Sequence, residues 1–388
     1  MPNSTRRRAK RKPDKPRPDF PLFAHSNGQW CKKICGALHY FGTWGDPQGA
    51  LNKYLDEKEA LRDGRTPRTK RDGLTVRALV NRFLTTKRAM VDADELTART
   101  FRDYHTNCAR IVSVFGKDRL VDDLAADDFE RMRTVLAKTM GPEARKVEIQ
   151  RTKTVFKYAY DAALIDRPVR YGPGFKAPTK RVLMKAKRQN GSRMFEATEL
   201  RMMLDAALPH IKAMILLGIN CGFGNSDIST LPKAALDLDH GWVDHPRQKT
   251  GTERRCPLWP ETVAALKEAI ANRPTPKDSA DDGLTFITIQ GNQWVRLQGN
   301  GWNDAVTIMC RELLAKLGLK RPGRNFYALR HTFRTIADET LDQPAINLIM
   351  GHTDTTMAGV YRERISDTRL QAVVDHVRLW LFNSTESK

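Results

Sequence analysis

The chain has 388 residues, and its 66 lysines and arginines against 45 aspartates and glutamates give a formal net charge of +21. This length allows two or three domains, and such a positive charge is typical of proteins that bind nucleic acid. No apolar run approaches the roughly 20 residues of a membrane-spanning helix, so the sequence predicts no integral membrane protein.

The N-terminus is basic, and we predict that residues 1–19 form a disordered arm that lies along phosphates, with a solubilising tail as the alternative. No apolar stretch follows it, so it does not look like a secretory signal peptide. The six cysteines are scattered without paired metal-ligand spacing. We therefore expect free thiols, no metal, and a cytoplasmic, nucleoid-associated protein.

Residues 20–64 predict a small domain of their own. Aromatic and β-branched residues over Gln29–Phe41 favour a short hairpin, and Asp46-Pro47 opens a helix that runs to about Arg62. Residues 64–73 are rich in Arg, Lys, Pro and Gly, which is typical of a linker.

Residues 74–168 predict a helical domain, because apolar residues recur at helical spacing, most clearly over Val147–Leu164. Basic residues decorate this last helix and are candidates for contacts with DNA phosphates, although an ordinary solvated face is the alternative. They are Arg145, Lys146, Arg151, Lys153 and Lys157. Residues 169–192 then form a basic linker.

Residues 193–388 predict a third domain. Thr198 is the expected N-cap of its first helix. Two strands, Trp242–Arg247 and Arg254–Leu258, flank a short turn at Lys249-Thr250-Gly251, after which helices dominate.

The most informative stretch lies near the C-terminus. Arg330 lies early in a predicted helix, Gly351-His352 opens a turn, and Tyr361 follows His352 by nine residues. Arginine can bind two phosphate oxygens at once, histidine can hydrogen-bond an oxygen or move a proton, and tyrosine can attack phosphorus and be held as an ester. Each residue alone is more often a packing or surface residue, but the combination indicates phosphoryl transfer.

This stretch resembles the C-terminal signature of the tyrosine recombinases of the phage integrase type, in which Leu-Arg-His-Thr precedes a Gly-His pair and the tyrosine. The resemblance implies that Tyr361 is the nucleophile and that Arg330 and His352 stabilise the transition state. Lys249, in a Lys-Thr-Gly turn, resembles the family's β-hairpin lysine, the general acid toward the leaving 5′-oxygen. The implied product is a 3′-phosphotyrosine with a free 5′-hydroxyl, formed without metal or cofactor.

The first arginine of the family departs from the pattern. Residues 221–228 resemble the box around it, with Asp227 in the acidic place, but the arginine itself falls at Gly224. Losing one positioned donor typically costs ~10²- to 10³-fold in rate. We expect Arg254 or Arg255 to compensate, and because residues alternate on a strand, only one of the two should face inward.

Two further positions bear on the same site. Asn225 is a candidate neutral hydrogen-bond donor beside Gly224. Tyr327 stands where many family members carry histidine, and its hydroxyl can still donate to a phosphate.

The resemblance implies a mainly α fold with small β elements. In this multidomain C-clamp, a helical core-binding domain (74–168) and an α+β catalytic domain (193–388) grip double-stranded DNA, and residues 20–64 form an arm-type DNA-binding domain. Four protomers would assemble on two duplexes, with the apolar C-terminal segment docked either on a neighbour or on its own domain. Two alternatives stay open: a catalytically weakened DNA-binding protein, suggested by Gly224, and a type IB topoisomerase, which shares the chemistry.

Overall fold

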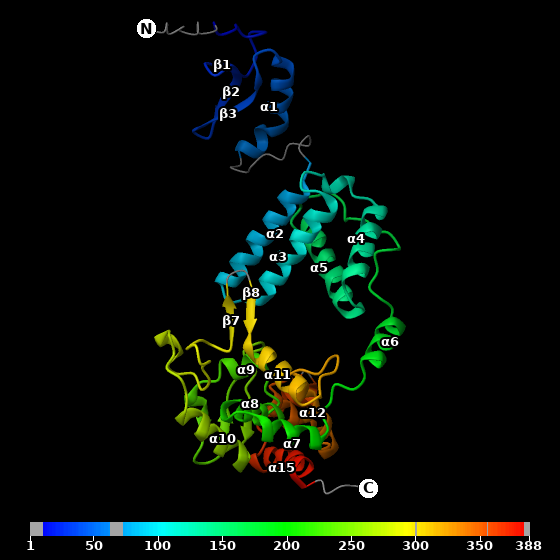
Figure 1. Cartoon of the computed structure of the whole chain (residues 1–388). Coiled ribbons are helices and arrows are strands. Elements are labelled where there is room, and N and C mark those ends of the chain that lie inside the picture. The colour runs from blue at the N-terminus through cyan, green and yellow to red at the C-terminus, as the bar shows by residue number, and fades with distance from the viewer. Residues whose placement is uncertain (1–10, 63–72, 299–300, 355, 384–388) are drawn as a thin grey trace, which may run out of the picture. The chain divides into compact units, whose positions relative to one another are not determined.

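The computed structural model describes residues 11–62, 73–298, 301–354 and 356–383. The chain divides into two compact units, residues 1–183 and 184–388 (Figure 1). The first unit holds two separate hydrophobic cores and the second holds one. None of the described helices is both long and apolar enough to cross a membrane.

The first core belongs to a three-stranded antiparallel sheet covered by one helix. The strands β1 (Phe23–His25), β2 (Gln29–Ile34) and β3 (Ala37–Thr43) pair in chain order, and α1 (Pro47–Arg62) packs on them through Tyr54. The predicted hairpin and helix are present. Strand β1 was not predicted, because three residues are too few to show an alternating pattern. The predicted linker at 64–73 lies almost wholly outside the described residues, as does the first half of the basic arm.

The second core joins four helices: α2 (Val76–Asp92), α3 (Ala98–Phe115), α4 (Ala126–Thr139) and α5 (Pro142–Asp161). The hydroxyls of Thr75 and Thr97 cap α2 and α3. Phe175 is fully buried in this core, so the core reaches past residue 168. The segment predicted as a linker contains a helix, α6 (Lys180–Asn190), none of whose side chains is buried.

The second unit, the candidate catalytic unit, is built around α8 (Pro209–Asn220), whose residues 213–220 are all buried. Helices surround it: α7 (Ala197–Ala206), α10 (Pro260–Ala271), α11 (Ala305–Lys316), α12 (Ala328–Ala337), α13 (Gln343–Met350) and α15 (Asp367–Asn383). The predicted N-cap was wrong: Thr198 lies inside α7, and Glu196 is the capping residue, since its backbone N–H donates to the Glu199 carboxylate at 2.9 Å.

Two small antiparallel sheets complete this unit. Strands β4 (Leu236–Asp237), β5 (Trp242–Asp244) and β6 (Arg255–Pro257) form one, and the hairpin β7 (Val295–Gln298) and β8 (Gly301–Asp304) forms the other. The strand pair around the Lys249 turn was predicted. The β7–β8 hairpin was not, and it interrupts a stretch that we expected to be helical.

The C-terminal helix α15 packs on its own unit. Its residues Leu370, Val373, Val374, Val377 and Leu381 are buried in the core, and the indole of Trp259 donates to the Val374 carbonyl at 2.9 Å. Of the two placements left open for the C-terminal segment, this chain shows the one on its own domain.

Candidate active site

Arg330 lies on the first turn of α12 and is only 3% exposed. Its Nη1 donates to the Gly222 carbonyl at 2.6 Å, and its Nη2 donates to the Met350 carbonyl at 2.7 Å. Burial, and next to it the charge of Arg247, lower the pKa of Arg330 to about 10, so it stays a cation at neutral pH. No carboxylate among the described residues pairs with this buried charge, which makes the position suited to an anionic ligand.

His352 lies beside Arg330. The Nη2 group of Arg330 donates to Nε2 of the imidazole at 2.7 Å. Burial, followed by the charges of Arg330 and Arg247, lowers the pKa of His352 to about 4, so the ring is neutral at pH 7. The backbone places it: Gly351 ends α13 with a left-handed φ of 63°, and the His352 N–H then donates to the Asn347 carbonyl at 2.8 Å.

Gly224 begins the short helix α9 (Asn225–Ser229) with an ordinary extended φ of −100°. Its N–H donates to the Asp227 carboxylate at 2.7 Å. A Cβ added here would lie 3.2 and 3.3 Å from two ring carbons of Tyr327. The place of the family's first arginine is therefore bounded by the Tyr327 ring.

Arg254 and Arg255 point in opposite directions, as expected of neighbours on a strand. The side chain of Arg254 is completely buried; its Nη2 bonds Asp227 at 2.7 Å and its guanidinium lies 4.4 Å from the centre of the Phe223 ring. Burial raises the pKa of Asp227, but Arg254 and the Gly224 N–H outweigh burial and lower it. Arg255 lies on the outside, in ion pairs with Asp244 at 2.7 Å and Asp367 at 3.0 Å.

Asn225 does not face the phosphate site. Its amide donates to Asp304 at 3.0 Å and to the Thr307 hydroxyl at 2.8 Å, so it links α9 to the start of α11. The expectation that it supplies a hydrogen bond in place of the missing arginine was wrong.

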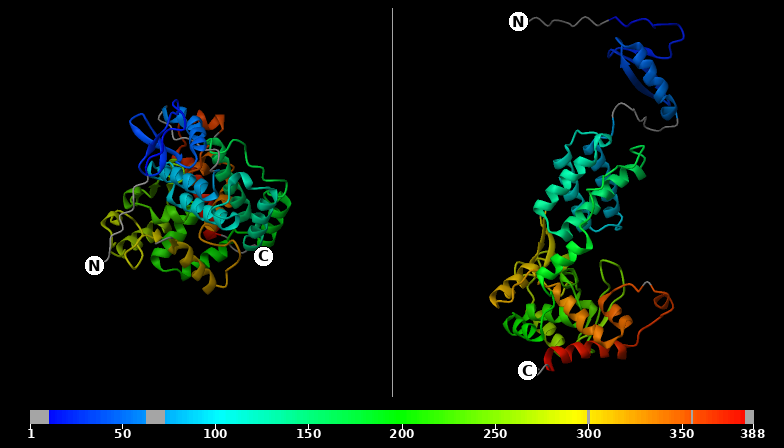
Figure 2. Two further views of the ribbon diagram at one scale, coloured as in Figure 1. Left: turned by 90° about the horizontal axis from the view of Figure 1, so that it is seen from above. Right: turned by 90° about the vertical axis from the view of Figure 1, so that its right-hand side faces the viewer.

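Lys249 and Tyr361 are both on the surface. Lys249 is exposed at the tip of the turn between β5 and β6. Tyr361 follows α14 (Met357–Val360) and is 77% exposed, and its hydroxyl makes no hydrogen bond with the described residues. Residues 356–366 run outside the packed helices (Figure 2).

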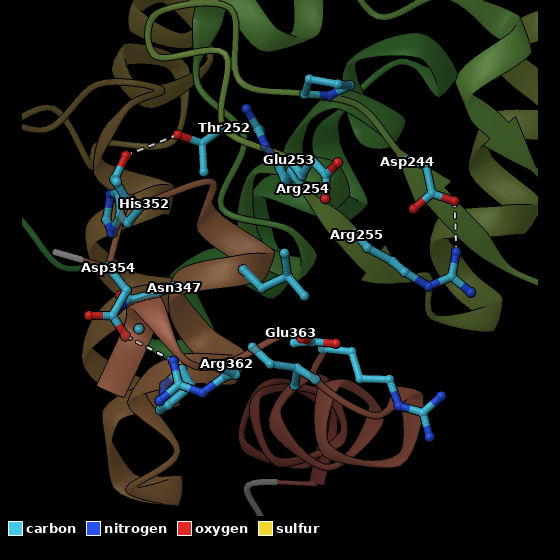
Figure 3. A pocket seen from close by; sticks show the side chains of 17 residues that line it. Asp244, Thr252, Glu253, Arg254, Arg255, Asn347, His352, Asp354, Arg362 and Glu363 are labelled. Atoms are coloured by element: carbon cyan, nitrogen blue, oxygen red, sulfur yellow. Dashed lines mark hydrogen bonds and ion pairs between the residues drawn. The ribbon is translucent and has the colours of Figure 1, made fainter. Parts of the chain in front are cut away.

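A cavity of about 760 Å³ lies beneath this segment. Figure 3 shows His352 and Thr252 on one side of it and the Asp354–Arg362 pair below them. Asp354 bonds Arg362 at 2.9 Å and accepts from the Thr356 hydroxyl at 2.7 Å, and these contacts lower the pKa of Asp354 to about 2. The carboxylate thus ties both ends of the turn that carries Tyr361.

Comparison with known proteins fits this geometry. The phage integrase family model matches residues 193–366, the stretch that contains the Arg330–His352 pair and Tyr361. Residues 193–366 are therefore a domain of the phage integrase family. A search of curated proteins finds no match.

Solved structures show the same fold. The lambda integrase dimer bound to a COC′ core site has a TM-score of 0.57 at 15% identity, over 91% of this chain and 99% of that chain. The lambda integrase tetramer bound to a Holliday junction has a TM-score of 0.54 at 15% identity, over 90% and 98%. The Tn1549 transposon integrase with circular intermediate DNA has a TM-score of 0.57 at 16% identity, over 78% and 99%. The mainly α, multidomain integrase fold is therefore the fold of this chain.

In this integrase fold, Arg330 and His352 are in direct contact, and Tyr327 and Arg254 lie around them. The phenol ring of Tyr327 lies against Gly224, and the residue is 43% exposed. Lys249 and Tyr361 make no contact with the pair. Among the described residues, no group of three His, Cys, Asp or Glu side chains is arranged to hold a metal ion.

One further basic residue, Arg247, lies beside the Arg330–His352 pair and was not among the residues singled out in the sequence. Arg247 pairs with Thr252 across the turn that carries Lys249, and its Nη1 lies 3.5 Å from the Gly351 carbonyl. The sequence carries a signal for it, because Arg247 ends the predicted strand before the turn and lies two residues before Lys249. The two arginines predicted to compensate for Gly224, Arg254 and Arg255, both follow the turn, whereas Arg247 precedes it.

The basic residues of α5 lie in the other unit and are partly engaged. Arg151 pairs with Asp103, Lys157 pairs with Asp161, and the Lys153 ammonium lies 5.3 Å from the centre of the Tyr171 ring. Lys146 is exposed, Arg145 is partly buried, and neither forms an ion pair with a described residue.

Proposed function

We propose that this integrase cuts and rejoins double-stranded DNA at specific sites through a 3′-phosphotyrosine at Tyr361. The phenolic oxygen attacks phosphorus, the bond to the 5′-oxygen breaks, and Lys249 gives that oxygen a proton. The phenolic proton passes to solvent, from which Lys249 regains its own, so protons balance. A 5′-hydroxyl from a partner duplex then reverses the step, and no metal or nucleotide takes part.

The contact between Arg330 and His352 carries this proposal. A buried guanidinium held by two carbonyls and an imidazole, without any carboxylate, is preorganised for an anion. Two of its hydrogen-bond partners, Gly222 and His352, belong to the two stretches that resemble family motifs. A scissile phosphate bound to Arg330 would lie between residues 356–366, which carry Tyr361, and the turn that carries Lys249.

The assembly follows from the same proposal. Double-stranded DNA is the partner, four protomers act on two duplexes, and the helical domain and catalytic unit hold the duplex between them as a C-clamp. Residues 20–64 bind a second, arm-type site. Phosphates lie along α5, where Arg145 and Lys146 are free of ion pairs, and the protein is nucleoid-associated in the cytoplasm.

The test begins with finding a DNA site. Duplexes that the full chain binds are selected from a random pool, and each is then made with a nick near the bound centre, so that the cleaved product diffuses away. A covalent adduct that survives denaturation, and that yields phosphotyrosine on digestion, supports the proposal. Selected duplexes that bind tightly yet never give an adduct contradict it and favour the weakened DNA-binding protein.

Tyr361→Phe is the matched control, since it keeps the ring and removes the attacking oxygen. We expect no adduct and an affinity for DNA within a few-fold of the wild type. Adduct formation by the Phe variant would show that another residue is the nucleophile. Relaxation of supercoiled plasmid without strand exchange between two duplexes would favour the topoisomerase.

A further inference from the structure

The proposed cleavage reaction needs a second cation beside the phosphate, and Arg330 supplies only one. As the tyrosine attacks, negative charge builds on the two non-bridging oxygens of the phosphate, and preorganised cations stabilise it. Arg330 supplies one cation, but position 224 has no side chain. The neutral His352 and Tyr327 can donate hydrogen bonds without supplying a second positive charge.

Arg254 does not fill this role. Its side chain is 0% exposed, so a phosphate oxygen cannot reach it without rearrangement, and Asp227 at 2.7 Å neutralises its charge. Its contacts assign it a positioning function instead. Asp227 also holds the Gly224 N–H, so the Arg254–Asp227 pair fixes the loop whose Gly222 carbonyl orients Arg330.

Arg255 cannot supply the second cation either, because its side chain points away from Arg330. Two carboxylates bind its guanidinium, and its face lies 4.1 Å from the centre of the Trp242 ring. All of these contacts are on the outer side of the strand. Arg254 therefore offers no donor that a phosphate can reach, since its unpartnered Nε and Nη1 are buried, and the guanidinium of Arg255 is held by two carboxylates.

Arg247, which follows β5 and forms an isolated β-bridge with Thr252 at the base of the turn, is both reachable and unpaired among the described residues. It is partly exposed, and no carboxylate among the described residues pairs with it. Its one hydrogen bond from the guanidinium, to Gly351, is long at 3.5 Å, so its donors are nearly free. The turn anchors its backbone, because its N–H donates to Thr252 and its carbonyl accepts from Gly251, both at 2.8 Å.

Arg247 lies beside the Arg330–His352 pair, where a second cation is needed. A Cβ placed on Gly351 would lie 2.9 Å from Cβ of Arg247, so the stem of Arg247 packs directly against the residue before His352. Arg247 is also the charge that most strongly lowers the pKa of Arg330, and it adds to the lowered pKa of His352, as a nearby unpaired cation must. Two cations held together without an anion repel each other until an anion binds.

We propose that Arg247 is the second phosphate-binding cation of this site and takes the place of the arginine that is missing at position 224. The inference rests on the proposed cleavage reaction. Arg247 and Lys249 belong to one turn, so the same movement of the turn brings a charge to the non-bridging oxygen and a proton to the leaving oxygen.

The experiment measures single-turnover adduct formation at saturating DNA on the nicked duplex. Arg247→Ala should lower the rate by ~10²- to 10³-fold, the usual effect of losing one positioned donor. Arg247→Lys should lose less, since it keeps the charge but not the planar pair of donors. Arg255→Ala is the control on the same hairpin, and its rate should stay within a few-fold of the wild type.

A second substrate separates contact with the phosphate from a structural role. Replacing one non-bridging oxygen of the scissile phosphate by methyl removes the charge that Arg247 neutralises, so the Arg247→Ala defect should shrink to a few-fold there. An equal defect on both substrates, or a normal rate on the ordinary phosphate, overturns the inference. Gly224→Arg should not activate the wild type, because Arg247 already supplies the second cation, and strong activation would likewise overturn the inference.

The outcome is distinct from failure of the proposed function. A wild-type protein that forms no adduct refutes the cleavage reaction itself. A wild-type protein that cleaves while Arg247→Ala cleaves equally well refutes only the role of Arg247.

Discussion

His352 is held neutral by burial and by the arginines around it. A pKa of about 4 in the folded chain, against roughly 6.5 for an unperturbed histidine, means that the unfolded chain binds more protons between these values. Stability from this residue is therefore complete above pH 6.5 and is lost as the pH falls toward 4.

We predict that the melting temperature of the catalytic unit falls between pH 7 and pH 5, and falls less in His352→Asn. Thermal unfolding at both values measures this. His245, His210 and His331, whose pKa values burial also lowers, account for the dependence that remains. His105→Asn, at an exposed histidine of the other unit, is the control and should leave the pH dependence of the melting temperature unchanged. An equal pH effect in the wild type and in His352→Asn would contradict the neutral imidazole.

The buried pair of Arg254 and Asp227 is the second residue-scale feature with a measurable effect. Replacing Arg254 by Met leaves the largely buried Asp227 carboxylate without its cation, with only the Gly224 N–H still bonded to it, and breaking a buried ion pair in this way typically costs ~3–5 kcal/mol. Removing a surface ion pair costs about 0–1 kcal/mol, so Arg255→Ala should barely move the transition. Urea unfolding of both variants tests this. Equal effects of the two would show that the buried Arg254–Asp227 ion pair stabilises the fold no more than a surface ion pair does.

The sequence located the site but not all of its members. Residue type and spacing identified Arg330 and His352, because the chemistry they share leaves a local signature. Arg247 lies close to Lys249 in the sequence but outside the motifs that resemble the family, and its contact with Gly351, 104 residues away in the chain, is not visible in the sequence. Asn225 was misread for the same reason: its partners, Asp304 and Thr307, lie on a distant helix.

At the scale of elements, hydrophobic periodicity predicted the long helices and missed short elements and a helix dominated by basic residues. Helix α6 was read as a linker because its large apolar residues, Val182, Leu183 and Met184, are adjacent and do not recur at helical spacing, and none of its side chains is buried. The β7–β8 hairpin has only four residues in each strand, and most of them are half-buried, so no alternation shows. Tertiary packing, which the local pattern does not contain, fixes such elements.

Helix α15 yields a prediction at this scale. Its five buried aliphatic side chains each contribute about 1.5–3 kcal/mol, together about as much as the whole stability of a typical domain. Removing residues 369–388 should therefore unfold the catalytic unit and abolish both single-site binding and synapsis. Circular dichroism and gel shifts on the truncated chain measure this.

Leu379→Glu is the matched control, because Leu379 is on the same helix and 53% exposed. It should leave unfolding unchanged. A truncated chain that still folds and binds one site, but no longer joins two duplexes, would show that α15 docks on a neighbour and not on its own unit.

The whole molecule carries a net charge of +21, and its proposed contacts with DNA are mostly with phosphates. Binding such a polyanion releases counterions, so affinity depends steeply on salt. We predict a fall of ~10³-fold or more between about 50 and 200 mM salt if six or more phosphates are engaged. Fluorescence anisotropy of a labelled duplex measures it, and a nearly flat salt profile would contradict an extensive basic interface.

Gly351 shows how much of this molecule depends on a position with no side chain. Its backbone has a φ of +63°, and any Cβ there would lie 2.9 Å from Arg247 and 3.2 Å from Nε of Arg254. A substitution would strain the backbone and push both arginines from their places, without altering any residue that touches DNA. In a saturation mutagenesis screen, Gly351 should therefore tolerate as few replacements as Tyr361. The two patterns would differ in kind, because variants at 361 should remain folded and bind DNA, whereas those at 351 should lose activity together with stability.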